Sequence, residues 1–313
     1  IEGDGPGTMA ELEREGQEHP VPSVHPAAEE VAVLIYTSGT TGDPKGVLLT
    51  HGNFTSNVIS GLKDFTTVDE NSVTLSILPW AHSFGQTAEL YAMTRVGAKV
   101  GIAGGVQTIL EDIQQVKPTF LIAVPRIFNR IYDGLWARMN KEGGIKKKLF
   151  LFALNAAKEK RLTLEAGQTP GFMTNFKFNL GDKLVFSKIR ERFGGRLKES
   201  MSGSAAMNAE IAQFFFDIGI SVYDCYGLTE TSPAVTVNSP SGVCLGSVGR
   251  PIEKVKVVID TTYGDPELGD GEIVVYGPNV MKGYHNKPEE TKAVLMEDGG
   301  FRTGDRGRLN DGG

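Results

Sequence analysis

Short runs of apolar and β-branched residues recur in the first half of the chain, and helix-like segments separate them. The helix-like segments include 53–62 and 86–95. Continuous apolar runs are typical of strands that are buried on both faces of a sheet. Strands that alternate with helices predict an α/β fold with layered, mostly parallel sheets and flanking helices. The runs are VAVLIY at 31–36, SVTLSIL at 72–78, KVGIA at 99–103 and TFLIAV at 119–124.

The second half of the chain has a different pattern. Residues 125–196 are helical and basic, with a loop predicted at 167–171. A helix predicted for 208–216 then lies between two strand-like segments, LKESMSG and SVYDCYG. Beyond Ser232 the strand runs are short and are separated by turn residues, which predicts a small antiparallel β subdomain. These runs lie at 255–260, 271–277 and 301–305.

The composition is that of an ordinary globular protein. The chain has 313 residues, 40% hydrophobic and 22% charged, which is enough for about two domains with a large core. Its 39 glycines and 15 prolines imply many tight turns and favour an enzyme of mixed architecture. Two cysteines and five scattered histidines exclude a disulfide framework and a four-ligand zinc site, which favours a cytoplasmic location. No apolar run approaches the length of about 18 residues needed to cross a bilayer.

Residues 1–30 differ from the rest of the chain. They hold eight acidic residues and four prolines but few apolar residues, which predicts an acidic linker or surface segment. They also lack a basic start followed by an apolar stretch, so no secretory signal is predicted.

The net charge of −6 is unevenly distributed. Residues 126–198 hold 17 lysines and arginines against 6 acidic residues, a net of +11, so the rest of the chain carries −17. Such a region suits an anionic membrane or ligand, and it equally suits a solvated lysine-rich helical face. We favour the solvated face and expect no nucleic-acid partner, while peripheral membrane contact through the basic region 141–198 stays open.

One predicted helix in this region, 145–161, places apolar residues on a single face with lysines beside it. Such a face either rests on a membrane or packs on the sheet, and packing is favoured. The apolar residues are Leu149, Phe152, Ala153 and Ala156.

A loop rich in glycine and hydroxyl groups follows the first strand-like run. Glycines let backbone amides converge on an anion, while hydroxyls add donors and a lysine adds charge, so YTSGTTGDPKGV at 36–47 predicts a polyphosphate-binding loop. A Walker loop is excluded, because Pro44 precedes the lysine and Gly46 follows it. The candidate ligands are Thr37, Ser38, Gly39, Thr40, Thr41, Gly42 and Lys45.

At this loop the chain resembles the adenylate-forming superfamily, which includes acyl-CoA synthetases, the adenylation domains of peptide synthetases and beetle luciferases. Two further strings, YGLTETSP at 226–233 and FRTGD at 301–305, follow in the family's order. The resemblance begins near Val31, inside the family's large N-terminal domain, and stops before the small C-terminal domain. The chain is therefore expected to be a fragment with impaired turnover. The resemblance implies α/β lobes that bind nucleotide and acyl chain at 31–235 and a small β-barrel-like subdomain at 236–313.

The resemblance assigns ligand contacts within these strings. Glu230 matches the family's Mg2+ ligand and is a hard oxygen donor of the kind that Mg2+ prefers beside phosphate. Thr229 would hydrogen-bond the α-phosphate, and Tyr226 and Gly227 would contact the adenine. Asp305 would accept hydrogen bonds from the two ribose hydroxyls.

Two other segments match the family's ligand-binding positions. SMSGSAAM at 200–207 is a strand-to-helix turn that suits either a helix cap or a ligand, and the resemblance assigns Gly203, Ser204 and Ala205 to nucleotide binding, with Gly203 and Ala205 also facing the acyl group. Asp224 would meet the adenine amino group. Cys225, with no histidine near it in sequence, is expected to pack rather than to act as a nucleophile.

His82 lies in LPWAHSFGQ at 78–86, in an apolar setting at a strand end. A lone histidine of this kind is more often a core residue than a catalytic one, but the resemblance places His82 beside the acyl carboxylate. Gln86 stands where some long-chain members carry a tryptophan gate. The resemblance thus implies four catalytic groups, Lys45, His82, Thr229 and Glu230.

PRIFNRIYDGL at 125–135 and the basic helical region after it resemble the long-chain fatty acyl-CoA synthetase branch. This implies activation of a medium- to long-chain fatty acid with ATP and Mg2+ to acyl-AMP, followed by transfer to coenzyme A. Two alternatives stay open: a fatty acyl-AMP ligase that passes the acyl group to a carrier protein, and a nucleotide-binding module without turnover.

Overall fold

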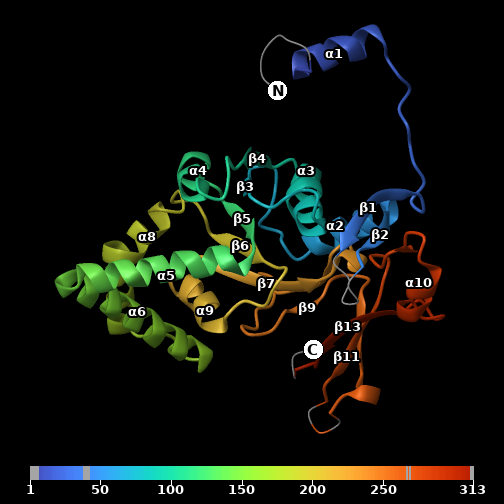
Figure 1. The fold of residues 1–313 in the computed structure, drawn as a ribbon. Coiled ribbons are helices and arrows are strands. Elements are labelled where there is room, and N and C mark those ends of the chain that lie inside the picture. Colours follow the sequence, from blue (N-terminus) through green and yellow to red (C-terminus); the bar gives the residue numbers. More distant parts are fainter. Residues whose placement is uncertain (1–6, 38–42, 266, 268, 311–313) are drawn as a thin grey trace.

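A five-stranded sheet lies at the centre of the computed structural model, which describes residues 7–37, 43–265, 267 and 269–310 (Figure 1). The strand order is β5-β6-β7-β8-β9. The first three strands are parallel, whereas β8 and β9 run antiparallel to their neighbours. The predicted α/β class is confirmed. The strands are β5 (Phe120–Ala123), β6 (Glu199–Ser202), β7 (Ser221–Gly227), β8 (Ala234–Val237) and β9 (Arg250–Pro251).

The length of the connections explains why this sheet is mixed. Parallel neighbours need a crossover of a dozen or more residues, and long helical segments connect β5 to β6 and β6 to β7. Only residues 228–233 separate β7 from β8, which is too few for a crossover, so β8 returns antiparallel beside β7. The string YGLTETSP forms this return.

Helices α5 to α9 gather at one end of the central sheet (Figure 1), as the helical pattern of 125–196 predicts. Their core is built on buried phenylalanines, including Phe128, Phe150 and Phe215. The predicted loop is also present, because residues 166–171 separate α6 from α7. The elements are α5 (Pro125–Glu142), α6 (Gly144–Glu165), α7 (Phe172–Gly181), η2 (Asp182–Phe186), α8 (Ser187–Glu191) and α9 (Ala209–Asp217).

A second group of elements covers the other side of β5. β3 (Val73–Ser76) and β4 (Lys99–Ile102) form a parallel pair. The Thr119 amide donates to the Val73 carbonyl oxygen and the Thr119 hydroxyl accepts from the Val73 amide, which joins β3 to the residue before β5. The two helices predicted at 53–62 and 86–95 are present. The helices are α2 (His51–Leu62), the π-helix η1 (Gly85–Ala92), α3 (Met93–Val96) and α4 (Ile109–Val116).

The first predicted strand lies outside the parallel sheet. β1 (Val31–Thr37) pairs antiparallel with β2 (Lys45–Thr50), which pairs with β12 (Gly283–Tyr284). Of the residues in β1 only Ile35 is buried, so the prediction of a buried strand is wrong here. Only seven residues separate β1 from β2, too few for a crossover, so β2 is an antiparallel neighbour and β1 lies at the edge of its sheet.

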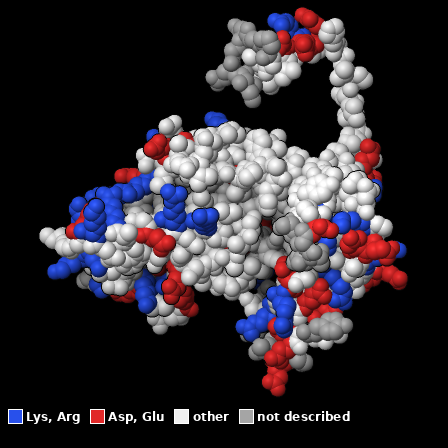
Figure 2. Space-filling model, viewed as in Figure 1, with Lys and Arg blue, Asp and Glu red and all other residues white. Residues whose placement is uncertain are grey.

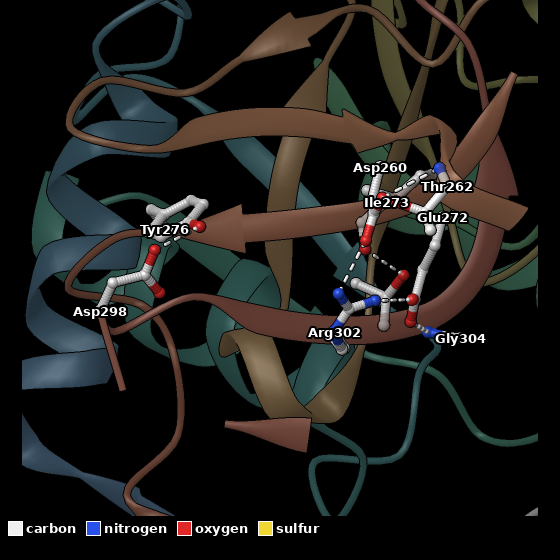
Figure 3. Close-up of polar contacts among 9 residues, drawn as sticks. Asp260, Thr262, Glu272, Ile273, Tyr276, Asp298, Arg302 and Gly304 are labelled. Carbon is white, nitrogen blue, oxygen red and sulfur yellow. Dashed lines mark hydrogen bonds and ion pairs between the residues drawn. The ribbon is translucent and has the colours of Figure 1, made fainter. Parts of the chain in front are cut away.

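The last part of the chain forms a three-stranded antiparallel sheet in the order β10-β11-β13, as its short runs predict. Arg302 connects all three strands, because its guanidinium pairs with Asp260 at 2.7 Å and with Glu272 (Figure 3). Gly304, in the FRTGD string of β13, donates its amide to Glu272 at 3.1 Å. The elements are β10 (Lys256–Asp260), η4 (Thr261–Tyr263), β11 (Gly271–Tyr276), α10 (Pro288–Val294) and β13 (Phe301–Gly307).

The N-terminal segment lies away from the rest of the molecule (Figure 1). It contains one helix that the sequence analysis did not predict, α1 (Met9–Glu18), in which no residue is buried. Good helix formers such as glutamate, leucine and arginine fill α1, and Thr8 caps it by accepting a hydrogen bond from the amide of Glu11.

Candidate functional site

Two hollows meet at the carboxyl end of β7. The first is a cavity of about 190 Å³ that is lined mostly by apolar side chains of α2, η1, β5 and β6. The second is a cleft of about 640 Å³ between the end of β7 and the β10-β11-β13 sheet. We call them the apolar cavity and the open cleft. Both are lined by the same four residues, Ser204, Cys225, Tyr226 and Gly227.

Glycine is required where the walls of the two hollows come together. A Cβ atom on Gly227 would lie 1.9 Å from the carbonyl oxygen of Pro233, and one on Gly203 would lie 2.7 Å from the Cys225 sulfur. Ser204 adopts φ 68°, in the left-handed region that glycine usually fills. Of these predicted site residues, Ser204 and Gly227 line both hollows and Ala205 lines the open cleft, whereas Gly203 is among the lining residues of neither.

The structure brings Tyr226 and Asp305 together, although 79 positions separate them in the sequence. The Tyr226 hydroxyl donates a hydrogen bond to Asp305 at 2.8 Å, and both residues line the open cleft. Burial, followed by the hydrogen bond to Asp305, raises the pKa of Tyr226, so this hydroxyl stays protonated as a donor.

Asp224 faces the SMSGSAAM turn with one carboxylate oxygen paired and the other unpaired. Oδ2 accepts a hydrogen bond from the Met207 amide at 3.2 Å, whereas buried Oδ1 has no hydrogen-bonding partner among the described residues. Burial raises the pKa of Asp224. An unpaired buried acceptor suits the amino group of a ligand, as the resemblance implies for this position.

Glu230 and Lys45 both contact the side chain of Tyr284. The Tyr284 hydroxyl donates to Oε1 of Glu230 at 3.0 Å, and the Lys45 ammonium lies 5.1 Å from the centre of the same ring. Thr229, next to Glu230, is buried and shares a hydrogen bond of 3.3 Å with Ser83 beside the apolar cavity. Three of the four predicted catalytic residues thus belong to one connected group.

Glu230 suits Mg2+ as a single carboxylate ligand. Within the described part of the chain, Oε1 accepts a hydrogen bond from Tyr284 and the second carboxylate oxygen accepts none, so it is available to a bound ion. The described residues contain no group of three or more candidate metal ligands. Mg2+ is typically held by one or two carboxylates together with phosphate oxygens and water, and the residues present therefore fit the ion.

Two buried asparagines that the sequence analysis missed hold the YGLTETSP return in place. The side-chain amides of Asn57 and Asn279 both donate to the carbonyl oxygens of Thr231 and Ala234 at 2.8 to 3.2 Å. They come from α2 and from the loop before β12, and each is at most 2% exposed. Asparagines in unrelated segments give no sequence pattern, so only the fold reveals this pair.

His82 is exposed and also lines the apolar cavity, and its role beside an acyl carboxylate stays a prediction. The turn 79–82 directs His82 outward, while the next two residues are buried. The His82 Nδ1 accepts a hydrogen bond from the Phe84 amide at 3.2 Å. Behind the turn, buried Glu89 accepts hydrogen bonds from Ser76 and the Ile77 amide.

The two ends of the glycine-rich loop lie on neighbouring strands, Thr37 on β1 and Lys45 on β2. Thr37 ends β1 and its hydroxyl donates to the Lys45 carbonyl oxygen at 3.5 Å. The remaining candidate phosphate ligands, Ser38, Gly39, Thr40, Thr41 and Gly42, lie outside the described residues.

Helix α6 of the basic region carries the apolar face for which the sequence left two alternatives, membrane contact or packing. In α6, Phe150, Ala153 and Ala156 are buried in the core beneath the helix, which supports the packing alternative. Figure 2 shows lysine and arginine side chains gathered at the end of the molecule that α5, α6 and α8 form. Among the described residues, no helix combines the length and apolar character needed to span a bilayer.

Comparisons with known proteins point to one family. A family model described as "AMP-binding enzyme" matches residues 2–285. The chain is 37% identical to fatty acyl-CoA synthetase A of Dictyostelium discoideum, over 97% of this chain and 45% of the relative. It is 36% identical to the peroxisomal long chain acyl-CoA synthetase 7 of Arabidopsis thaliana, over 92% of this chain and 41% of the relative. The chain therefore spans less than half the length of these relatives.

Solved structures agree with this assignment. The ATP-bound crystal structure of MatB from Rhodopseudomonas palustris superposes with a TM-score of 0.67 at 25% identity, covering 93% of this chain and 48% of MatB. The apo form of the same protein gives a TM-score of 0.68 at 23% identity, over 94% of this chain and 48% of that one, which bears on the fold alone. On the family match and the shared fold, the chain belongs to the AMP-binding enzyme family, and its relatives are long-chain fatty acyl-CoA synthetases.

Proposed function

We propose that this chain binds ATP-Mg2+ and a medium- to long-chain fatty acid, as part of an AMP-forming fatty acyl-CoA ligase. One observation carries the proposal: the apolar cavity and the open cleft share four wall residues. The cleft is lined by several residues that the resemblance assigns to nucleotide binding. An acid whose chain fills the cavity would present its carboxylate at this shared wall, where the α-phosphate of a nucleotide in the cleft would also lie. The relatives named as fatty acyl-CoA synthetases support the same substrates.

In the proposed reaction each residue of the site has one role. The acid carboxylate attacks the α-phosphorus of ATP and pyrophosphate leaves. Lys45 and the Thr229 hydroxyl stabilise charge on the phosphates, and His82 at the cavity mouth orients the carboxylate. Bound Mg2+ would neutralise phosphate charge from its position on Glu230. The resulting acyl-AMP then transfers its acyl group to the thiol of coenzyme A, so the protein contributes orientation and electrostatics rather than a covalent nucleophile.

Nucleotide binding is the most direct test on this chain. Calorimetry with ATP, with and without Mg2+, should show tighter binding when the ion is present, and Glu230→Ala should remove that gain. Glu13→Ala, on exposed helix α1, is the matched control and should behave like the wild type. Equal affinity with and without Mg2+ in both the wild type and Glu230→Ala would refute the role of Glu230.

Turnover distinguishes the proposed ligase from its alternatives. Pyrophosphate exchange with a panel of carboxylic acids, on this chain and on a longer protein that includes the segments its relatives carry, should rise with acyl length. Preference for acetate, an amino acid or an aromatic acid would contradict the substrate class. Acyl transfer to a carrier protein but not to coenzyme A would favour the acyl-AMP ligase, and binding without exchange in both proteins would favour a nucleotide-binding module.

We also propose a cytoplasmic protein that contacts a membrane surface through its basic region. Exposed apolar residues on α7 and η2 are spaced four apart, which places them along one helix side. Helix α6 has exposed apolar residues of its own, among them Leu149 of its predicted face, which is 37% exposed. Exposed Lys183 and Lys188 lie in the same stretch of sequence as α7 and η2, one on each side of Leu184, as suits an anionic bilayer. Binding to phosphatidylglycerol vesicles should exceed binding to phosphatidylcholine vesicles, and equal binding would contradict the proposal. The apolar residues are Phe172, Phe176, Leu180 and Leu184.

A further inference from the structure

Tyr284 contacts both of the charged groups that the proposed function assigns to ATP-Mg2+. Its side chain is only 8% exposed. Its hydroxyl donates to Oε1 of Glu230 at 3.0 Å, and its ring centre lies 5.1 Å from the Lys45 ammonium. A cation at this distance from an aromatic centre is attracted by the negative face of the ring. One side chain therefore limits the positions of two functional groups that come from different segments.

The backbone around Tyr284 is fixed from several directions. Tyr284 pairs with Val47 of β2, and its amide donates to the Thr291 hydroxyl of α10 at 2.9 Å. The next residue, His285, donates its amide to the Gly46 carbonyl oxygen at 2.7 Å. Because Gly46 is adjacent to Lys45, these contacts tie the ring to the strand that carries the lysine.

Glu230 is tied to the same segment through its main chain. The Met281 amide donates to the Glu230 carbonyl oxygen at 2.8 Å, while Asn279 holds the carbonyl oxygens of Thr231 and Ala234. The stretch 279–284 therefore fixes the Glu230 backbone at one end and the Glu230 carboxylate at the other. A carboxylate held at both its backbone and one oxygen has few remaining rotamers.

We propose that Tyr284 is a positioning residue that orients the Glu230 carboxylate toward a bound metal ion and holds the Lys45 ammonium beside the phosphates. The inference rests on the proposed function. The hydroxyl occupies one carboxylate oxygen and leaves the other for Mg2+, while the ring limits where the ammonium can lie. The two tasks use different parts of the side chain, so different substitutions separate them.

The test compares two substitutions of Tyr284 by calorimetry of ATP on the full chain. Tyr284→Phe keeps the ring and removes the hydroxyl, so the gain in ATP affinity on adding Mg2+ should fall about fivefold to tenfold, while Mg2+-free affinity stays within about twofold. Tyr284→Leu also removes the ring, so Mg2+-free affinity should fall as well, by about threefold to fivefold. A merely structural role would lower both affinities equally in Tyr284→Phe.

Tyr276→Phe is the matched control. The Tyr276 hydroxyl also donates to a carboxylate, that of Asp298 at 3.0 Å, but on β11 (Figure 3). This variant should leave both affinities unchanged. Circular dichroism and thermal melting would establish that each variant folds, and Tyr284→Phe decides the matter even if Tyr284→Leu does not fold.

Glu230→Ala separates the failure of this inference from failure of the proposed function. If Glu230→Ala loses the Mg2+ gain but Tyr284→Phe keeps it, the positioning role is wrong and the metal assignment stands. If Glu230→Ala keeps the gain, the metal assignment is wrong and the inference falls with it. Loss of the gain in both variants, with Tyr276→Phe unchanged, is the result that we expect.

Discussion

The apolar cavity and the open cleft share a wall but are built from different parts of the chain. Several residues of the cleft lie in short sequence strings, and one of them, Gly227, packs its backbone against the Pro233 carbonyl oxygen with no room for a Cβ atom. The cavity is lined by side chains from helices and strands that lie far apart in the sequence. Backbone contacts leave no freedom for a larger residue, whereas side chains adjust their rotamers and volumes.

The difference between the two walls matches a difference between the two proposed ligands, a nucleotide of constant shape and a fatty acid of variable length. A nucleotide presents the same phosphates, ribose and base every time, so a rigid wall of backbone suits it. A fatty acid varies in length, so a wall of exchangeable side chains suits it. We therefore expect substitutions in the cleft to act on the fold and on nucleotide binding together, and substitutions in the cavity to act on the acid alone.

The largest expected effect is that of Gly227→Ala in the wall of the cleft. Its Cβ atom would lie 1.9 Å from a carbonyl oxygen that cannot rotate away, so we expect a loss of unfolding free energy of about 3 kcal/mol or more and no measurable ATP binding. Denaturant unfolding and calorimetry would measure both.

Two other glycine-to-alanine substitutions provide a scale for the loss of unfolding free energy in Gly227→Ala. Gly203→Ala meets the movable side chains of Cys225 and Phe84 and should cost about 1 to 2 kcal/mol. Gly134→Ala, on α5 with no atom within 4 Å of the new Cβ, should stabilise by about 0.5 to 1 kcal/mol. If Gly227→Ala and Gly203→Ala cost the same, the distinction between backbone and side-chain walls is wrong.

A second prediction fills the apolar cavity. Ala92 is buried and lines the cavity, so Ala92→Phe should lower the affinity for hexadecanoate by about tenfold to thirtyfold through loss of volume, with less effect on short acids. The affinity for ATP should stay within about twofold of the wild type. Displacement of a fluorescent fatty acid and calorimetry of ATP would measure the two ligands separately.

Ala137→Leu, on the exposed side of α5, is the control for added side-chain volume and should change neither affinity. An equal loss of ATP and hexadecanoate affinity in Ala92→Phe would show that the cavity and the cleft are not independent.

Much of the cleft could be predicted from sequence, because its residues lie in consecutive strings. Tyr226 and Asp305 were named from two such strings, and the structure places them 2.8 Å apart. The apolar cavity could not be predicted, since residues such as Phe65 and Ile252 become neighbours only in the folded chain. Tyr284 and Asn57 were missed for the same reason, because they act on the motif from other segments.

The fold was predicted well where the period of apolar residues was regular, as in the parallel strands and the long helices. It was wrong for β1, because an apolar run does not reveal whether the next strand runs parallel or antiparallel. The exposure of His82 could not be read from the sequence, since a turn decides whether one polar residue among apolar neighbours faces inward or outward.

A third prediction uses the two cysteines, one in the shared wall and one outside it. Burial, followed by the nearby Asp224, raises the pKa of the Cys225 thiol, whereas Cys244 is exposed. Because the thiolate is the reactive form, iodoacetamide at neutral pH should label Cys244 at least about tenfold faster.

Peptide mass spectrometry would measure the labelling rate of both cysteines, and in Cys244→Ser only the slower labelling of Cys225 would remain. Faster labelling of Cys225 would contradict the raised pKa of its thiol.

The smallest expected effect concerns Glu89 behind the cavity. Burial raises its pKa, so the folded protein keeps this proton to a higher pH than the unfolded chain does. The contribution of Glu89 to stability therefore falls as the pH rises from its unfolded value, about 4.3, through its folded value. In Glu89→Gln that pH dependence should be absent, so the variant should gain stability relative to the wild type between acidic and neutral pH.

Urea unfolding over a pH series would measure the difference between the two proteins. The unfolding free energy of the control Glu13→Gln, at an exposed position, should change with pH in the same way as that of the wild type. A difference between wild type and Glu89→Gln that does not change with pH would contradict the raised pKa.

The shared wall also decides where a protein engineer should search for new acid preferences. Ser204, Cys225, Tyr226 and Gly227 line both hollows, so a library that varies them selects on two ligands at once, and most of its members are lost to poor nucleotide binding. A library confined to positions on α2 and η1, such as Val58, Ala88 and Ala92, selects on the acid alone. The same number of clones then explores far more usable diversity.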